Sequence, residues 1–202
     1  MRDIKTLILT AVALVFFSVS IAAGNSEEER AMQIGRTAAE KLASTLQSEL
    51  MAAMKRGGPS AAVEVCSTKA QVLTEQVNHD LSTQGIIVKR TTLKLRNPLN
   101  APDEFETSIL KEFAEMKSNN EQIKPRVIIV DGNYRFVSPI FVRGLCTRCH
   151  GAEDKLDPSV KAILAERYPQ DKAVDYKVGD LRGIVSVVIP KAALAGQQKK
   201  NE

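Results

Sequence analysis

Apolar residues at helical spacing dominate residues 27–81. Between Glu27 and Arg56 they recur every four positions, and acids fill the first turn, which predicts one long helix. Gly57-Gly58-Pro59 is expected to end this helix. Ser60 can cap a second helix that runs to about Leu81, so the two helices are expected to form a hairpin. The apolar face of the second helix comprises Val63, Cys66, Ala70, Leu73 and Val77.

The spacing changes from helical to strand-like after Gly85. Residues 86–95 are rich in β-branched side chains, which is typical of a strand. Two prolines in residues 96–102 then indicate a loop. Asp103 is the expected N-cap of a helix that runs to about Lys117.

The second half of the chain alternates strands with short helical insertions. Residues 126–130 and 134–142 are predicted strands around Asp131-Gly132-Asn133, a strong hairpin signal. Residues 157–168 begin with Asp-Pro and predict a short helix, and residues 183–190 predict a last buried strand. Two helices followed by about four antiparallel strands with helical insertions indicate an α+β fold.

Residues 1–23 have the pattern of a secretory signal peptide. Arg2 and Lys5 precede an apolar run, and small residues follow it. The run is shorter than the about 20 apolar residues of a membrane span, so cleavage is expected, with an uncleaved membrane anchor as the alternative. The rest of the chain is therefore expected in the periplasm or an equivalent oxidising compartment.

The composition fits one exported domain. Residues 24–193 are expected to form it, and the Lys- and Gln-rich residues 194–202 are expected to be a disordered tail. The formal net charge of +4 in 202 residues is mild, and basic residues are interspersed with acids, so nucleic acid is not an expected partner. The sequence has no Ser-His-Asp set, paired-carboxylate signature or phosphate loop, so we do not expect an enzyme.

Cys146-Thr147-Arg148-Cys149-His150 is the motif that carries chemistry. Two cysteines three apart, with a histidine directly after the second, match the attachment motif of c-type haem. In that motif the thiols of Cys146 and Cys149 bond the haem and the His150 imidazole binds its iron. The chain has only 3 Cys and 2 His, so chance is a poor explanation. One motif predicts one covalent haem.

Two other uses of this cysteine pair are weaker. A zinc site needs about four ligands, usually with a second pair at matching spacing, and only Cys66 and His79 remain. A thioredoxin-like dithiol is expected near a βαβ unit, at a strand-to-helix junction. Cys146 instead follows a predicted strand and precedes a polar loop.

Cys66 is an unpaired thiol in a chain that is expected to be exported. It can be an inert buried residue, a partner in a disulfide to another chain, or a ligand. At about 100° per residue, His79 points about 140° away from Cys66 on the second helix and is expected at the surface. Met51 and Met54 are rival sulfur ligands, although Met more often fills gaps in a core.

Several short motifs occur in a specific order along the chain: Val65-Cys66-Ser67, Arg96-Asn97-Pro98-Leu99-Asn100, Pro139-Ile140, Cys146 to His150 with Gly151, and Gly179-Asp180-Leu181-Arg182-Gly183. In this order and spacing they resemble a known family: single-haem c-type domains with a PAS-like fold. Such domains occur as a cyanobacterial haem protein and as the extracytoplasmic sensor region of some bacterial receptors. The resemblance covers most of the chain after the leader.

The resemblance implies a five-stranded antiparallel sheet wrapped by the N-terminal helices, with haem between sheet and helix. It implies Cys66 as the second axial ligand. A redox or gas sensor that signals to a partner protein is the implied role, and a periplasmic electron carrier with a redox partner is the alternative. Arg96 and Asn97 either bind the haem propionates or cap the loop around Pro98.

A few further side chains are candidates for the surroundings of the haem. Tyr134, Phe136 and Phe141 lie on the predicted strand before the motif. Strand alternation places Phe136 and Phe141 on opposite faces, so one of them is expected to belong to the core alone. Asp180 and Arg182 are expected to form a turn into the last strand.

Overall fold

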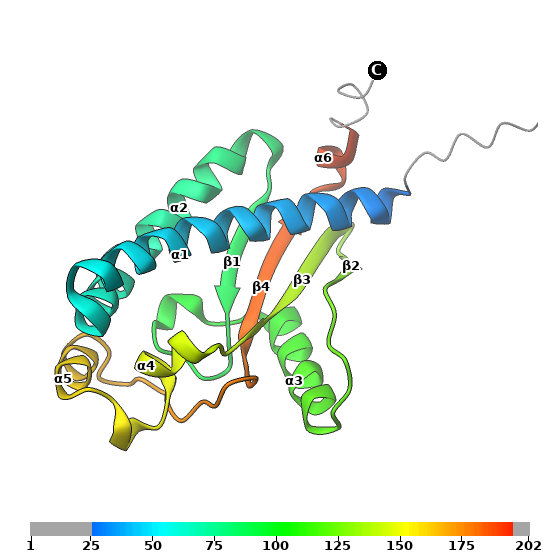
Figure 1. The fold of residues 1–202 in the computed structure, drawn as a ribbon. Coiled ribbons are helices and arrows are strands. Elements are labelled where there is room, and N and C mark those ends of the chain that lie inside the picture. Colours follow the sequence, from blue (N-terminus) through cyan, green and yellow to red (C-terminus); the bar gives the residue numbers. More distant parts are fainter. Residues whose placement is uncertain (1–25, 196–202) are drawn as a thin grey trace, which may run out of the picture.

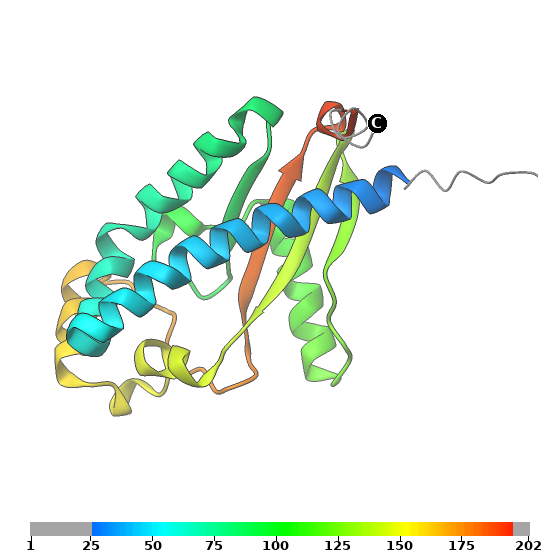
Figure 2. The same cartoon turned by 45° about the horizontal axis from the view of Figure 1, so that its top comes forward.

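Helices cover both faces of an antiparallel sheet in the computed structural model, which describes residues 26–195 (Figure 1). Helix α1 (Glu27–Thr68) crosses one face, and α2 (Ala70–Leu81) returns beside it, as both views show (Figure 2). The predicted signal peptide and residues 196–202 of the predicted tail lie outside the described residues. The tail was predicted to begin at residue 194, but Leu194 is buried in helix α6 (Lys191–Ala195) because it packs into the apolar core beneath α1. No helix within residues 26–195 is both long and apolar enough to cross a membrane.

The chain reverses direction inside α1, at the predicted position. Gly57 and Gly58 leave helical geometry, and Gly58 has φ +68°, a conformation that glycine adopts at no steric cost. The predicted second helix is split at Lys69, where α1 ends and α2 begins. Backbone hydrogen bonds from Lys69 N to Val65 O and from Leu73 N to Lys69 O, each 2.9 Å, continue across the split. We call residues 59–68 the far limb of α1.

The sheet contains four strands within the described residues. They are β1 (Ile87–Thr91), β2 (Arg126–Val130), β3 (Asn133–Phe141) and β4 (Leu181–Ile189). Their order is β1-β4-β3-β2, and every pair is antiparallel. Asp131 and Gly132, with φ of +49° and +74°, form the tight turn between β2 and β3. The α+β prediction is confirmed.

The five strands implied by the family resemblance are not present in the described residues. Strand β1 ends at Thr91, not at Leu95 as the sequence pattern suggested, and a loop follows it. This loop includes the short 3₁₀ turn η2 (Pro98–Asn100), and Pro98 and Pro102 lack the N–H that strand pairing requires. Within residues 26–195 no further strand pairs with the outer edge of β1, which agrees with the sequence-based expectation of about four strands.

Each face of the sheet has its own apolar core. Helix α1 packs on one face, around Phe136 and Val187, and Gly35 lies directly against the Phe136 side chain. Helix α3 (Glu104–Ser118) packs on the other face through Ile109 and Phe113. The remaining short elements are η1 (Ser82–Gln84), η3 (Gly144–Cys146), α4 (Thr147–His150), η4 (Glu153–Lys155), α5 (Pro158–Arg167) and α6 (Lys191–Ala195).

Candidate functional site

A cavity of about 300 Å³ lies between the far limb of α1, strand β1, the end of β3 and α4. Its volume falls at the lower end of the range for small-molecule sites, about 300–1,000 Å³. The cavity brings together the residues that the sequence singled out from distant parts of the chain. Cys66, Arg96, Asn97, Cys146, Cys149 and His150 all line it.

The Cys-Xaa-Xaa-Cys-His motif forms one compact turn directly after β3. Elements η3 and α4 follow each other without a break, which places Cys146, Cys149 and His150 along the same cavity. Gly151 ends the turn, and a Cβ at this position would lie 2.5 Å from the Thr147 carbonyl oxygen. Any larger residue would therefore push the turn open.

The His150 imidazole is fixed by a backbone carbonyl. Its Nδ1 lies 2.7 Å from the carbonyl oxygen of Ala173, so Nδ1 carries the proton and donates it. Nε2 is left as the nitrogen able to bind a metal. Burial lowers the pKa of His150 to about 3, and the side chain is therefore neutral, as a metal ligand must be.

Cys66 supplies a thiol from another wall of the cavity. It lies on the far limb of α1 and opens into the cavity, while its carbonyl oxygen accepts a hydrogen bond from the Tyr168 hydroxyl at 3.3 Å. Burial raises the pKa of the Cys66 thiol, and the nearby guanidinium groups of Arg90 and Arg96 act in the opposite direction. Burial also raises the pKa of Cys149, to about 11.

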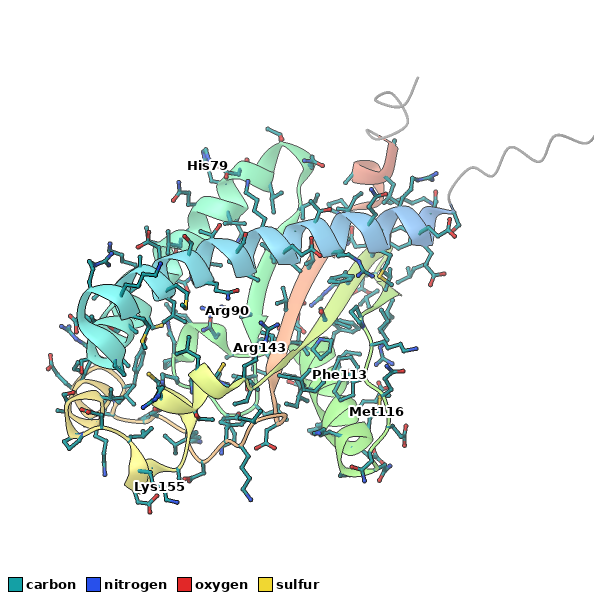
Figure 3. The ribbon with its side chains drawn as sticks, viewed as in Figure 1. His79, Arg90, Phe113, Met116, Arg143 and Lys155 are labelled. Carbon is teal, nitrogen blue, oxygen red and sulfur yellow. The ribbon has the colours of Figure 1, made fainter. Side chains whose placement is uncertain are left out.

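The other side chains considered as ligands are placed less favourably. His79 is exposed on α2, and Figure 3 shows it on the outer side of that helix, away from the cavity. This confirms the predicted orientation of His79. Met54 lines the cavity, whereas Met51 is 38% exposed and does not.

Arg96 and Asn97 line the cavity but already have partners in the protein. Arg96 donates from Nε to Asp171 at 2.9 Å, and from Nη2 to the carbonyl oxygens of Cys149 at 2.6 Å and Ala173 at 3.2 Å. The Asn97 side chain accepts from the Leu99 N–H at 3.0 Å and so caps η2. The loop-capping alternative is thus present for Asn97, and binding of propionates by either residue stays a prediction.

Arg90 is a cavity residue that the sequence interpretation missed. Its side chain makes no hydrogen bond or ion pair within residues 26–195, and Figure 3 shows it in the interior between the helices and the motif segment. Burial lowers the pKa of its guanidinium. The sequence carries a signal for it: Arg90 lies two residues after fully buried Val88 and so shares its face of β1. A charge that is withdrawn from water is costly unless it is paired.

The polar segment 171–176, which we call the strap, closes the motif from outside. Its backbone N–H groups bond the carbonyl oxygens of Leu95, Gly151 and His150, at 2.8 to 2.9 Å. The sequence indicated only a polar loop here, because these contacts use backbone atoms that leave no residue signature. The strap holds the His150 carbonyl as well as its ring.

Of the three aromatic candidates on β3, only Phe141 lines the cavity. Phe136 is buried in the α1-side core, and the Tyr134 hydroxyl donates to Glu27 at 2.5 Å, far along the strand. This agrees with the expected separation of Phe136 from Phe141. Asp180 accepts from the Lys177 N–H at 2.7 Å in the predicted turn, whereas Arg182 belongs to β4 and lines the cavity.

The donor groups surround the cavity and do not converge on one point. Within residues 26–195, no three His, Cys, Asp or Glu side chains lie close enough together to hold a bare metal ion. The arrangement instead leaves thiols, an imidazole and cationic side chains around a largely apolar space. Such a donor set fits a large, flat group with a central metal and acidic substituents.

Comparison with known proteins agrees with this geometry. The Tll0287-like family model matches residues 20–190. The chain belongs to the Tll0287-like family. The crystal structure of the cyanobacterial heme-protein Tll0287 is 27% identical, with a TM-score of 0.58, and the match covers 78% of this chain and 94% of that one. No curated protein sequence matched the chain.

Proposed function

We propose that this Tll0287-like protein binds one haem covalently through Cys146 and Cys149. One observation carries the proposal: the two thiols and the imidazole of the motif line the same cavity as Cys66, which comes from a distant helix. The likeness to a solved haem protein supports it. Bound haem would supply a one-electron redox centre. The protein itself is proposed to be a binding module and not an enzyme.

The covalent attachment has a direct chemical test. Denatured protein should keep its haem through acid-acetone extraction, with one haem per chain, because thioethers do not release it. Haem in the organic phase would reject the attachment. The mature protein should begin near residues 23–25 and occur in the periplasm; full-length mass in a membrane fraction would favour the anchored alternative.

His150 and Cys66 are the proposed axial ligands. The bond from His150 Nδ1 to Ala173 supports Nε2 as one ligand, and the position of Cys66 in the cavity supports its thiolate as the other. Cys66→Ala should change the ferric electron paramagnetic resonance (EPR) spectrum and raise the midpoint potential, because an anionic thiolate stabilises ferric iron. The matched variant His79→Ala should change neither. A change in the EPR spectrum and potential of His79→Ala, with none in Cys66→Ala, would refute the assignment. A change in Met54→Leu alone would assign the second ligand to the Met54 thioether instead.

Arg90 is the residue proposed here to pair with a haem propionate. Its guanidinium has no hydrogen-bond partner within residues 26–195, whereas Nε and Nη2 of Arg96 are engaged. A bidentate pair between arginine and carboxylate is a strong charge-assisted contact. Arg90→Gln should therefore shift the potential and its pH dependence without loss of covalent haem. If only Arg96→Gln changes that pH dependence, the propionate belongs to Arg96.

A redox or gas sensor that reports to a partner protein is the function proposed for the whole chain. Its support is the Cys66 thiol that opens into the cavity, where desolvation raises its pKa and so favours the protonated form; a protonated sulfur would hold iron more weakly than a thiolate and leave a site for a small gas. Exposure of Phe141 and Leu145 beside the motif favours the second candidate, electron transfer to a docked redox partner. The reduced spectrum with carbon monoxide separates the two. Rapid binding supports sensing, and an unchanged six-coordinate spectrum supports electron transfer.

A further inference from the structure

The Ala173 carbonyl oxygen accepts two hydrogen bonds, one from each side of the site. His150 Nδ1 donates to it at 2.7 Å and Arg96 Nη2 at 3.2 Å. Ala173 itself is fully buried, so no solvent competes for either bond. The ring orientation of His150 therefore depends on where this one carbonyl is held.

Asp171 holds the same residue, Ala173, through its N–H group. One carboxylate oxygen of Asp171 accepts the Ala173 N–H at 2.8 Å, and the other accepts Arg96 Nε at 2.9 Å. The side chains of Arg96 and Asp171 are each only 10% exposed, so the pair is shielded from water and salt. Arg96 and Asp171 thus form a clamp on both polar groups of Ala173.

Arg96 also connects the clamp to the haem motif. Its Nη2 donates to the carbonyl oxygen of Cys149 at 2.6 Å, one residue before His150. The strap and the motif turn are consequently tied to one guanidinium. A lysine at this position would keep the positive charge but lacks the planar guanidinium. It could not donate to Asp171, Cys149 and Ala173 at the same time.

We infer that Arg96 and Asp171 are positioning residues for the His150 imidazole, which set how strongly its Nε2 donates to a bound metal. The inference rests on the proposed function, because it assigns Arg96 to the iron ligand and not to a propionate. The physical cause is the second-shell bond: a well-aligned acceptor on Nδ1–H raises the basicity of the ligating nitrogen. Loosening the clamp weakens that bond, makes Nε2 a poorer donor and so favours ferrous iron.

Three variants of the haem-loaded protein test this inference. Arg96→Lys keeps the positive charge but removes the planar guanidinium that makes these hydrogen bonds. Asp171→Asn replaces one of the two accepting carboxylate oxygens with an NH2 group. Arg182→Lys is the matched control, since Arg182 also lines the cavity but bonds Thr92 and Lys94, not the motif. The readouts are the midpoint potential and the pulsed EPR signal of the remote imidazole nitrogen, which reports the Nδ1–H bond.

The clamp predicts that Arg96→Lys and Asp171→Asn both change the remote-nitrogen signal and both raise the potential. Arg182→Lys should leave that signal unchanged. If these residues act only through their charge, Arg96→Lys should not shift the midpoint potential, and the remote-nitrogen signal should stay unchanged in all three variants. That result would overturn the inference. If Arg96→Lys does not fold, the nitrogen signal of Asp171→Asn decides.

Failure of the inference is distinguishable from failure of the proposed function. Covalent haem content, measured as the pyridine haemochrome of denatured wild-type protein, tests the function. Wild-type protein with covalent haem and an unchanged nitrogen signal in both clamp variants would overturn the inference alone. Wild-type protein without covalent haem would overturn both.

Discussion

Gly35 of α1 lies directly against Phe136 of β3, and its replacement by alanine is a sharp test of the packing. An ideal Cβ at Gly35 would lie 2.3 Å from Cγ and 2.4 Å from Cβ of Phe136. Both atoms are at the root of a side chain that is 1% exposed, so the ring cannot swing aside. Helix α1 must move away from β3 instead.

The expected net effect of Gly35→Ala is destabilisation by about 1–2 kcal/mol. Overpacking a core costs about 1–3 kcal/mol, and the better helix propensity of alanine returns at most about 1 kcal/mol. In a domain of this size that lowers the melting temperature by about 2–8 °C. Urea unfolding followed by circular dichroism measures the free-energy difference directly.

Two further variants make the test of Gly35 decisive. Thr37→Ala, on the exposed face of α1, has no such contact and should be neutral or slightly stabilising. Phe136→Leu makes room, so the double variant with Gly35→Ala should be less unstable than the sum of the single variants, by about 0.5 kcal/mol or more. If Gly35→Ala stabilises the protein, or if the two changes are additive, the described contact between α1 and β3 is wrong.

Three other predictions concern polar contacts away from the site. Glu106→Gln should lower the free energy of unfolding by about 3 kcal/mol, because Glu106 is 1% exposed and ion-paired with Arg135; a loss under 1 kcal/mol would contradict its role. Asn78→Ala should cost about 1–3 kcal/mol, since the amide makes two hydrogen bonds to edge strand β1, and a neutral result would argue against them. The hydrogen bond from Arg126 lowers the pKa of the Glu112 carboxyl. The stability that this carboxylate contributes is therefore present above the pKa of Glu112 in the unfolded chain, and it is lost as pH falls through the lower pKa of Glu112 in the folded protein. The stability difference between wild type and Glu112→Gln should therefore shrink in acid, and a difference that grows would reverse the sign.

The sequence predicted those parts of the fold and site that depend on residue type. The Gly57-Gly58-Pro59 reversal, the Asp131-Gly132 turn and the motif at residues 146–150 each need particular residues, so their patterns are visible. Placement of Cys66 and His79 followed from helical phase, which the hydrogen bonds across Lys69 preserve. These features required no knowledge of the tertiary structure.

The features that could not be predicted depend on backbone atoms or on long-range geometry. The carbonyl oxygen of Ala173 looks like any other in the sequence, and only the fold brings it to His150. Strand β1 ends at Thr91 because Thr92 turns to donate its hydroxyl to the Arg182 carbonyl oxygen, a contact between segments far apart in the chain. Arg90 was detectable by alternation, but its use depends on the cavity that three other elements complete.

The segment between β3 and β4, residues 142–180, contributes the motif and Tyr168 to the lining of the cavity. This segment carries the motif turn, the strap that holds His150, and α5. The far limb of α1 packs on α5 through Val63 and Val160, and Ser60 shares a 2.5 Å hydrogen bond with Ser159.

Helix α5 therefore fixes the wall that carries Cys66, although Cys66 belongs to α1. Both proposed ligands consequently depend on one insertion, His150 through the strap and Cys66 through α5, while the strands contribute other lining residues, among them Arg90 and Arg182. A movement of α5 relative to the strap would change the separation of the two ligands without disturbing the sheet cores on either side.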